Sequence, residues 1–319
     1  MSTVSCREYA RKMFRRHRGV PKEAIKSFFT ELQVLKKVQH YHCVELVRTI
    51  SPSLPPRYQT ILKYIKAQSY TDPKYFALLM VPVGECNLYE YYIQAHNSPD
   101  RLSLLRSFFG CLTNALEYIH SSKIRHRDIK PQNIIVKGDR VFLTDFGIAL
   151  DWENLSRSTT TADSGKTPIY AAPEVARYER RNTAADVWSL GCVFFEMATV
   201  LKGQTVDAMR AFFAERSGNN RFYANIKEFG AWVDTLLGMG SPRDDVVFRW
   251  VRAMLQEEGK DRPTAASLYA DITTECMKHN VPFCGLCCLE AVDSSGVEDG
   301  DEDELWHEAA ELTLDANLS

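Results

Sequence analysis

The two parts of this 319-residue chain carry different periodic patterns of apolar residues, and this difference constrains the fold most strongly. Ahead of Gly84, a helical pattern over 21–47 precedes strand-like runs at 58–65 and 75–83. The second run is almost wholly apolar, as in a buried strand. Beyond Gly84 helical periods dominate, at 102–120, 184–201, 206–216, 226–237 and 246–255, with one strand pair at 134–136 and 141–143. The sequence therefore predicts an α+β fold in which a small sheet-bearing part precedes a larger helical part.

The formal net charge of −2 conceals a strong asymmetry along the chain. Residues 289–319 hold 11 acidic side chains and no Lys or Arg, which leaves the rest with 39 basic against 30 acidic side chains. A basic body suits an anionic partner such as a nucleotide, and an acidic end also favours solubility. The acidic stretch predicts a disordered tail, within which Leu305, Trp306, Leu312 and Leu314 could form a short docking helix.

Neither secretion nor a membrane span is expected. Basic residues interrupt the first apolar positions, so no signal segment forms at the start of the chain. The longest apolar stretch, 193–201, contains Glu196 and is far shorter than the roughly 20 residues that cross a bilayer. Nine cysteines without an export signal indicate a reducing compartment, the cytoplasm or the nucleus.

Five residues able to ligate a metal gather near the end of the chain: Cys276, His279, Cys284, Cys287 and Cys288. A Cys-x-x-Cys element can contribute to a Zn²⁺ site, but structural zinc normally takes two paired elements separated by a loop. The irregular spacing favours reduced thiols, and zinc is the alternative.

One stretch carries the chemistry of this sequence. Residues 126–133 read His-Arg-Asp-Ile-Lys-Pro-Gln-Asn, and Asp145-Phe146-Gly147 begins 12 residues after Asn133. Three motifs follow in order: Ala-Ala-Pro-Glu at 171–174, Asp-Val-Trp-Ser-Leu-Gly at 186–191 and Asp-Arg-Pro-Thr at 261–264. One tripeptide arises by chance, whereas several ordered motifs do not. Over about residues 9–277 the set closely resembles the protein kinase family.

This resemblance implies a two-lobed protein-kinase-like fold, with a reduced small lobe built on an antiparallel sheet and a mainly helical large lobe. The implied divisions are 1–83 for a partial small lobe, 84–280 for the large lobe with its catalytic loop and activation segment, and 281–319 for the cysteine-containing and then acidic tail.

The resemblance assigns catalytic roles to residues that phosphoryl transfer needs. Asp128 would accept or orient the proton of the acceptor hydroxyl, and Lys130 would supply positive charge to the transferring group. Asn133 and Asp145 would hold Mg²⁺, which prefers carboxylate and amide oxygens. ATP and Mg²⁺ are thus the implied cofactors. Lys130 lies in an Asp-x-Lys-Pro-x-Asn form similar to Ser/Thr kinases, which implies a protein substrate with a Ser or Thr acceptor.

The resemblance also implies a nucleotide site. Lys12 matches the strand lysine that grips the phosphates, and Glu31 matches its carboxylate partner, with Leu35, Phe146 and His126 forming an apolar spine. The hinge matches 76–84, where Met80 guards a rear pocket and Val81 and Val83 face adenine. Two residues would sandwich the base, namely Ala10 and Ile135. Asn87 is either a ribose contact or a helix cap.

Regulation is implied by a hydroxyl-rich stretch at the position of an activation loop. Thr160 and Thr161 are candidate phosphorylation sites for an upstream activating kinase, and Arg127 would pair with the phosphate. An unmodified polar loop is the alternative. Thr167 matches the threonine that contacts the catalytic Asp and Lys. The remaining match is architectural, a buried ion pair of Glu174 with Arg262.

The sequence departs from the family pattern at its start. Kinases place a glycine-rich loop roughly 15–20 residues before the strand lysine, whereas only 11 residues precede Lys12 and none is Gly. We therefore expect the loop and the first two strands to be absent, with three strands left in the small lobe. Either the chain is truncated relative to its natural gene product or it is a reduced kinase fold, and in both cases MgATP binding should be weak.

Three functions compete at this point. The first is an active Ser/Thr protein kinase, which the polar residues of the large lobe favour. The second is a truncated kinase or pseudokinase acting as a binding or scaffold module, which the absent glycine-rich loop favours. The third is a kinase-fold enzyme acting on small molecules, against which Thr167 and the 171–174 motif argue. No nucleic acid and no membrane partner is expected.

Overall fold

The structure, a computed structural model, describes residues 8–15, 22–50, 75–152, 168–279 and 281–289. The chain divides into two units, Met1–Gly285 and Leu286–Ser319. The strands are β1 (Ala10–Arg15), β2 (Glu45–Ile50), β3 (Tyr75–Val81), β4 (Cys86–Asn87), β5 (Ile124–Arg125), β6 (Ile134–Lys137), β7 (Arg140–Leu143) and β8 (Leu150–Asp151). The α-helices are α1 (Lys22–Lys37), α3 (Leu88–Ala95), α4 (Pro99–Ser121), α5 (Pro173–Ala176), α6 (Ala184–Leu201), α7 (Val206–Ser217), α8 (Phe229–Leu236), α9 (Val247–Met254), α10 (Ala265–His279) and α11 (Leu286–Leu289). Short 3₁₀ helices are η1 (Pro131–Asn133), η2 (Pro168–Tyr170), η3 (Phe222–Ala224), η4 (Ile226–Glu228), η5 (Pro242–Val246) and η6 (Gly259–Asp261).

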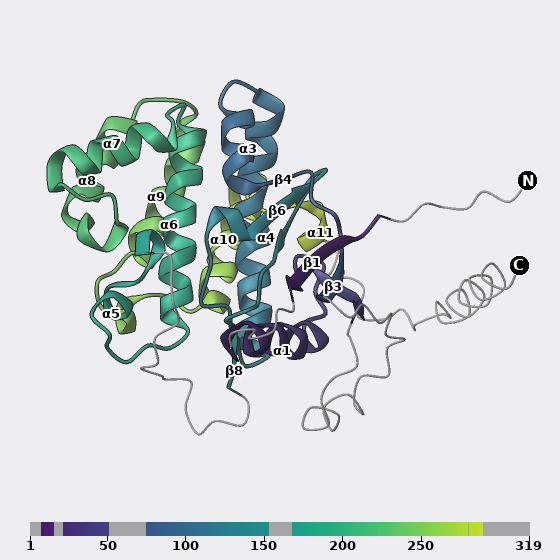
Figure 1. The fold of residues 1–319 in the computed structure, drawn as a ribbon. Coiled ribbons are helices and arrows are strands. Elements are labelled where there is room, and N and C mark those ends of the chain that lie inside the picture. The colour runs from purple at the N-terminus through teal and green to yellow at the C-terminus, as the bar shows by residue number, and fades with distance from the viewer. Residues whose placement is uncertain (1–7, 16–21, 51–74, 153–167, 280, 290–319) are drawn as a thin grey trace, which may run out of the picture. The chain divides into compact units, whose positions relative to one another are not determined.

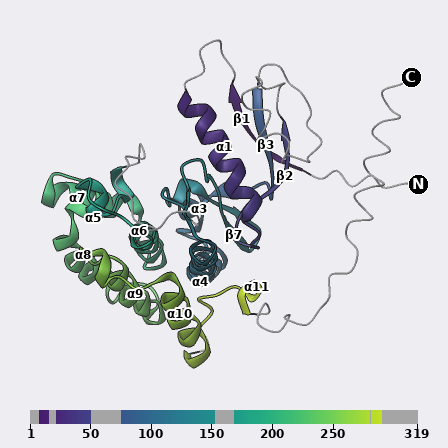
Figure 2. The same ribbon diagram turned by 90° about the horizontal axis from the view of Figure 1, so that it is seen from below.

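The first sheet is a three-stranded antiparallel sheet in the order β1-β3-β2. Its central strand β3 is apolar and buries Ala77, Leu78 and Met80, as the sequence predicts for this run. Helix α1 lies alongside this sheet (Figure 2) and buries Phe28, Leu32 and Leu35, which recur on one helical face. Glu31 comes from the same buried side of the helix, so the sheet and α1 together carry a carboxylate into the interior.

The helical pattern over 21–47 is only partly right. Helix α1 ends at Lys37, and Glu45–Ile50 forms strand β2 instead. This segment contains Val47, Thr49 and Ile50, whose branched Cβ atoms favour strands, and β3 supplies its hydrogen-bonding partner. The expected strand at 58–65 lies outside the described residues. The described small sheet thus has three strands, as predicted, but one of them is β2 at 45–50, where a helix was predicted.

Helices dominate the rest of the first unit, and α6 lies at their centre (Figure 1). Almost every side chain of α6 after Ala185 is buried, α9 packs against it, and α10 packs against α4. Among the described helices, α6 alone is long and apolar enough to span a membrane by length and composition. Most of it is buried in the protein, as is usual for the central helix of a globular core.

Most predicted helices are confirmed, although their observed bounds differ from the predicted ones. The prediction over 184–201 matches α6, whereas 226–237 divides into η4 and α8, and η5 precedes α9. The sequence pattern missed α3 and α10. Helix α3 begins at Leu88, directly after Asn87, whose side chain accepts a hydrogen bond from Glu90 N while the Glu90 side chain accepts one from Asn87 N. This capping box identifies Asn87 as a helix cap.

The predicted strand pair at 134–136 and 141–143 is confirmed as the hairpin β6–β7, with β4 on its other edge. Lys137 pairs with Arg140, and Gly138 takes a positive φ of 58° in the turn. Glycine tolerates this conformation because it has no Cβ. The segment that connects β5 to β6 contains residues 126–133, and it is held at one end by the pairing of β5 with β8 and at the other by the hairpin.

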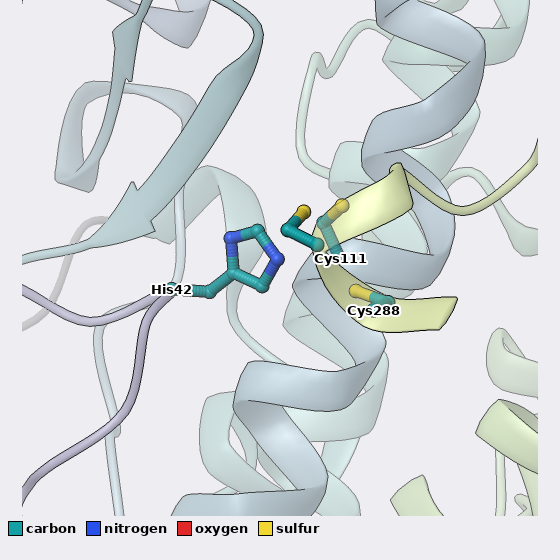
Figure 3. A group of neighbouring side chains, drawn as sticks. His42, Cys111 and Cys288 are labelled. Carbon is teal, nitrogen blue, oxygen red and sulfur yellow. The ribbon is translucent and has the colours of Figure 1, made fainter. Parts of the chain in front are cut away.

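No disulfide joins the cysteines of the described residues, and Cys6 lies outside them. In the first unit, a ring nitrogen of His42 and the sulfur of Cys111 lie within 4.8 Å of each other, and both side chains are fully buried (Figure 3). The His42 Nδ1 lies 2.8 Å from the carbonyl oxygen of Val141. Cys287 and Cys288 belong to α11 of the second unit.

The contact of α6 with α9 depends on a glycine. A Cβ at Gly191 would lie 2.8 Å from Met254 Cβ and 2.9 Å from Leu255 Cδ2, both buried. We expect Gly191→Ala to destabilise the protein by about 1–3 kcal/mol, because overpacking forces neighbouring side chains aside. Gly230→Ala is the matched control, since nothing lies within 4 Å of a Cβ in α8 at that position. Urea unfolding measures both, and an unchanged stability of Gly191→Ala would contradict the close packing.

Candidate active site

The candidate active site is organised around a lysine that contacts two carboxylates. Lys12 on β1 donates hydrogen bonds to both Glu31 oxygens at 2.8 and 2.7 Å and to Asp145 Oδ1 at 2.7 Å. Glu31 is fully buried, whereas the side chains of Lys12 and Asp145 are 32% and 42% exposed. The exposed side of this group therefore faces solvent, where an anionic ligand has access.

These contacts shift the pKa values at the site. Burial alone would lower the pKa of Lys12, but the charges of Glu31 and Asp145 and their hydrogen bonds raise it. Burial alone would raise the pKa of Asp145, but the charge and hydrogen bond of Lys12 hold it below its ordinary value. At neutral pH the site therefore holds a charged ammonium beside ionised Asp145, which suits a cation and a phosphate.

Helix α1 docks on the segment 145–147. Ser27 Oγ donates to the Gly147 carbonyl at 3.0 Å, and a Cβ at Gly147 would lie 2.8 Å from Ser27 Oγ. The ring of Phe146 is fully buried and packs on His126 with 4.9 Å between centroids. Leu35, one turn after Glu31, is buried on α1. The position of α1 is therefore coupled to that of Asp145.

Two side chains of the predicted catalytic loop converge on one carboxylate. Asp128 Oδ2 accepts hydrogen bonds from Lys130 Nζ at 2.9 Å and from Asn133 Nδ2 at 3.0 Å. Asn133 Nδ2 also donates to the Asp128 carbonyl at 2.9 Å. Thr144 N donates to the Asn133 carbonyl at 3.0 Å, which links the loop to the residue preceding Asp145. Asp128, Lys130, Asn133 and Asp145 thus belong to one connected set.

A buried carboxylate for which the sequence predicted no site role holds this loop in place. Asp186 on α6 accepts backbone hydrogen bonds from His126 N at 2.9 Å and Arg127 N at 2.8 Å. Arg127 has a φ of 69°, a strained value for a residue with a side chain. Burial would raise the pKa of Asp186, but hydrogen bonds from His120 and Arg127 N lower it. In the sequence, the motif at 186–191 was the feature that could have indicated this role of Asp186.

The expected adenine-facing residues come from three strands and the hinge. Ala10 pairs with Met80 across β1 and β3, and Met80 is buried at 6% exposure. Val81, Val83 and Ile135 are half-buried. Gly84 lies directly on Ile135, because a Cβ there would be 2.8 Å from Ile135 Cβ. The glycine allows the hinge backbone to approach β6 closely.

Of the residues expected to act in regulation, the structure describes Arg127 but not the three threonines. Thr160, Thr161 and Thr167 lie outside the described residues. Arg127 is placed beside Asp128 on the catalytic loop, where its backbone N–H is held by Asp186. Its role in contacting a phosphate stays a prediction.

Glu174 and Arg262 form a bidentate ion pair with two contacts of 2.8 Å. The Arg262 guanidinium is fully buried, donates to three backbone carbonyls and lies 5.0 Å from the ring centroid of Trp188. This pair attaches the end of the 171–174 motif to the helical core.

A second buried network, which no sequence pattern predicts, lies around Tyr170. Tyr170 donates its hydroxyl to Glu196 Oε1 at 3.0 Å, and Arg210 Nη2 donates to both residues at 2.9 Å. Burial raises the pKa of Glu196 to about 7, although Arg210 and Tyr170 oppose this effect. Ser189 donates to the Tyr170 carbonyl at 3.0 Å. Both the hydroxyl and the backbone carbonyl of Tyr170 are therefore hydrogen-bonded, which fixes the residue immediately before Ala171. Only the tertiary structure brings the members of this network together.

The sequence profile of the protein kinase domain matches residues 1–280. Together with the fold and this site, the match shows that the chain belongs to the protein kinase family.

Its relatives include named Ser/Thr kinases. Serine/threonine-protein kinase atg1 of Schizosaccharomyces pombe is 29% identical, with 56% of this chain and 23% of that protein covered. Serine/threonine-protein kinase AtPK2/AtPK19 of Arabidopsis thaliana is 30% identical, with 60% and 36% covered. Serine/threonine-protein kinase fused of Drosophila melanogaster is 29% identical, with 56% and 19% covered. The chain thus spans between 19% and 36% of these relatives.

The buried ion pair gives a stability prediction. Glu174→Gln leaves the guanidinium of Arg262 buried without its counter-charge, which typically costs about 3–5 kcal/mol. Glu228→Gln makes the same chemical change in the exposed pair of Glu228 with Arg216 and should cost under about 1 kcal/mol. Urea denaturation of both variants tests this difference. Equal losses would show that the Glu174 pair contributes no more than a surface contact.

Proposed function

We propose that this chain is an ATP-dependent protein kinase that transfers the γ-phosphoryl group of MgATP to Ser and Thr hydroxyls of proteins. The observation that carries the proposal is the connected set of Asp128, Lys130, Asn133 and Asp145. It places a carboxylate base, a cation and two oxygen donors on neighbouring segments. Family membership and the names of the relatives support the same conclusion.

The donor set fits a nucleotide with a divalent cation. Bound MgATP supplies the phosphoryl group together with the cations that neutralise its charge. Lys12 is charged and lies beside Asp145 on the accessible side of the site, where it suits phosphate oxygens. The amide nitrogen of Asn133 is engaged with Asp128, which leaves its amide oxygen as the atom able to ligate a cation. Half-buried Ala10 and Ile135 offer apolar surface for the base.

Asp128 and Lys130 act on the acceptor side. Asp128 accepts a hydrogen bond from the substrate hydroxyl and takes its proton as the new O–P bond forms. Lys130 lies 2.9 Å from Asp128, so its positive charge is available where negative charge develops. The hydrogen bonds of Asp186 to the loop backbone preorganise both side chains before substrate arrives.

The proposal extends to regulation and location. An upstream kinase phosphorylates the segment that contains Thr160 and Thr161, and Arg127 contacts the phosphate, in the cytoplasm or the nucleus. The charge of a guanidinium next to Asp128 supports this extension, since phosphate–arginine contacts order such segments.

A phosphorylation assay distinguishes the proposed function from two others, a binding module and a small-molecule kinase. The purified chain is incubated with radiolabelled ATP, Mg²⁺ and a peptide array that offers Ser, Thr or Tyr acceptors. Label on Ser or Thr peptides is the expected result. Nucleotide binding without label on any peptide would favour a binding module, and label only on small alcohols would favour a small-molecule kinase.

Removing the proposed base gives the sharpest test of the mechanism. Asp128→Asn keeps the size of the side chain but cannot accept the proton, so transfer should fall by about 10²–10⁴-fold. MgATP affinity should remain largely unchanged, because Asp128 contacts the acceptor rather than the nucleotide. Peptide phosphorylation and a fluorescent nucleotide titration measure the two effects. Transfer equal to that of the parent would remove Asp128 from the mechanism.

The proposed metal ligand should behave differently. Asp145→Ala removes a carboxylate, so Mg²⁺-dependent binding of a non-hydrolysable ATP analogue should weaken by about 10–100-fold. Asp139→Ala, in the exposed turn of the β6–β7 hairpin, is the matched control and should bind like the parent. Calorimetric titration with and without Mg²⁺ separates the metal effect. Equal binding by both variants would contradict the assignment of Asp145.

A further inference from the structure

A pocket of about 280 Å³ lies between helix α3 and the junction of α6 with α7. Figure 1 shows α3 beside α6, and the contacts between these two helices agree with that view. The lining residues come from α3, from the end of α6 and from the start of α7, so the pocket is separate from the candidate active site. Its volume is just below the roughly 300–1,000 Å³ of typical small-molecule sites, which favours a small ligand.

Aromatic and aliphatic side chains form most of this pocket. Tyr89 and Tyr92 come from α3, and the buried residues Val200 and Val206 come from α6 and α7. Ile93 also lines the pocket, although its side chain is 70% exposed. A single exposed Ile is normal on a protein surface, but this one extends a concave apolar wall towards solvent. The walls therefore suit an aromatic ring that enters from solvent.

The tyrosine at the edge of the pocket is held in place by two neighbours. The Tyr89 hydroxyl donates to Asp207 Oδ1 at 3.2 Å, and the guanidinium of Arg210 lies 5.3 Å from the centroid of the Tyr89 ring. That guanidinium is itself bound to Tyr170 and Glu196. Side chains that are already ordered lose little conformational freedom when a ligand binds. This wall of the pocket is therefore formed before a ligand arrives.

Two polar groups of the pocket can accept hydrogen bonds from a ligand. Asp207 is exposed, and its second carboxylate oxygen has no hydrogen-bond partner among the described residues. Of the described residues that line the pocket, Asp207 is the one carboxylate, and none of them is Lys or Arg. His96 also lines the pocket, and its buried Nδ1 has no partner in the described part of the chain. Buried polar atoms normally have a partner, and a neutral imidazole with its proton on Nε2 accepts through Nδ1.

We propose that this pocket is a binding site for a small aromatic amine, whose ring packs between α3 and the start of α7 and whose ammonium group pairs with Asp207. The ring fills the apolar part of the pocket, and the ammonium donates to the second oxygen of Asp207. A tyrosine face beside the cation adds a further attraction. A neutral analogue lacks the ion pair, and Asp207 repels an anionic one.

This inference is independent of the proposed phosphoryl transfer. None of the residues that line the pocket belongs to the connected set of Asp128, Lys130, Asn133 and Asp145. Binding of an amine is measured without ATP, Mg²⁺ or an acceptor peptide. Either proposal can therefore fail without the other.

The test titrates phenethylamine into the full chain, with carbon-13 in the methyl groups of Ile and Val, and follows the methyl resonances by NMR. We expect the resonances of Ile93, Val200 and Val206 to shift together, with a Kd of about 0.1–1 mM. Phenethyl alcohol, which carries a hydroxyl in place of the ammonium, should bind about 3–10-fold more weakly, and phenylacetate should not bind. Equal binding of the three compounds, or shifts confined to other methyl groups, would overturn the proposal.

Variants separate the charge of the pocket from its apolar wall. Asp207→Asn keeps the size of the side chain but removes its charge, so phenethylamine should bind about 3–10-fold more weakly while phenethyl alcohol binds as before. Ile93→Ser shortens the exposed part of the wall and should weaken both compounds by about 2–5-fold, as followed at Val200 and Val206. Asp234→Asn, an exposed position on α8 that does not line the pocket, is the matched control and should bind like the parent.

Two further results would contradict the assignment. Parent-like binding of phenethylamine to Asp207→Asn would show that the carboxylate does not recognise the amine. A basic peptide that contains Phe is titrated in parallel. If this peptide shifts the Val200 and Val206 methyl groups and the free amine does not, the pocket is a peptide-docking groove and the proposal is wrong. If a variant does not fold, the comparison of the three compounds on the parent chain still decides the matter.

Discussion

The buried carboxylate of Asp186 is the constraint on which the candidate site depends. It accepts two successive backbone N–H groups, and this holds Arg127 in a left-handed conformation that a residue with a side chain adopts reluctantly. Because the carboxylate lies on the buried central helix α6, its hydrogen bonds attach the loop to the helical core. Asp128, Lys130 and Asn133 then need only short local hydrogen bonds to complete their arrangement.

A second layer of buried polar contacts connects this core to the segment 170–174. Glu174 is bound to Arg262, and Tyr170 is bound to Glu196 and Arg210. Each charge is buried but partnered, which is how proteins tolerate ionised groups away from water. Both networks end on α6 or on elements packed against it. The segment 170–174 is thereby fixed to the same helix that holds the catalytic loop.

The sheet-bearing part meets the helical part through Lys12, Glu31 and Asp145. The lysine comes from β1, the glutamate from α1 and the aspartate from the segment after β7. Any motion of α1 would therefore separate charges that now neutralise one another. The same three residues belong to the proposed site for a phosphate and a divalent cation, so the contact that joins these parts would also shape that site.

The sequence by itself determined the family and the α+β class and proposed the residues of the catalytic loop, because these depend on residue types at fixed short spacings. It also indicated α6 and the β6–β7 hairpin, whose periods and turn residues are local. Only the tertiary structure decided that 45–50 is a strand, since β3 must be present to pair with it. Likewise, Arg210 approaches Glu196 and Cys284 fills the space above Gly110 only through packing between distant segments. No local pattern encodes such contacts, because hydrogen bonds and volume are satisfied by neighbours that the fold alone brings together.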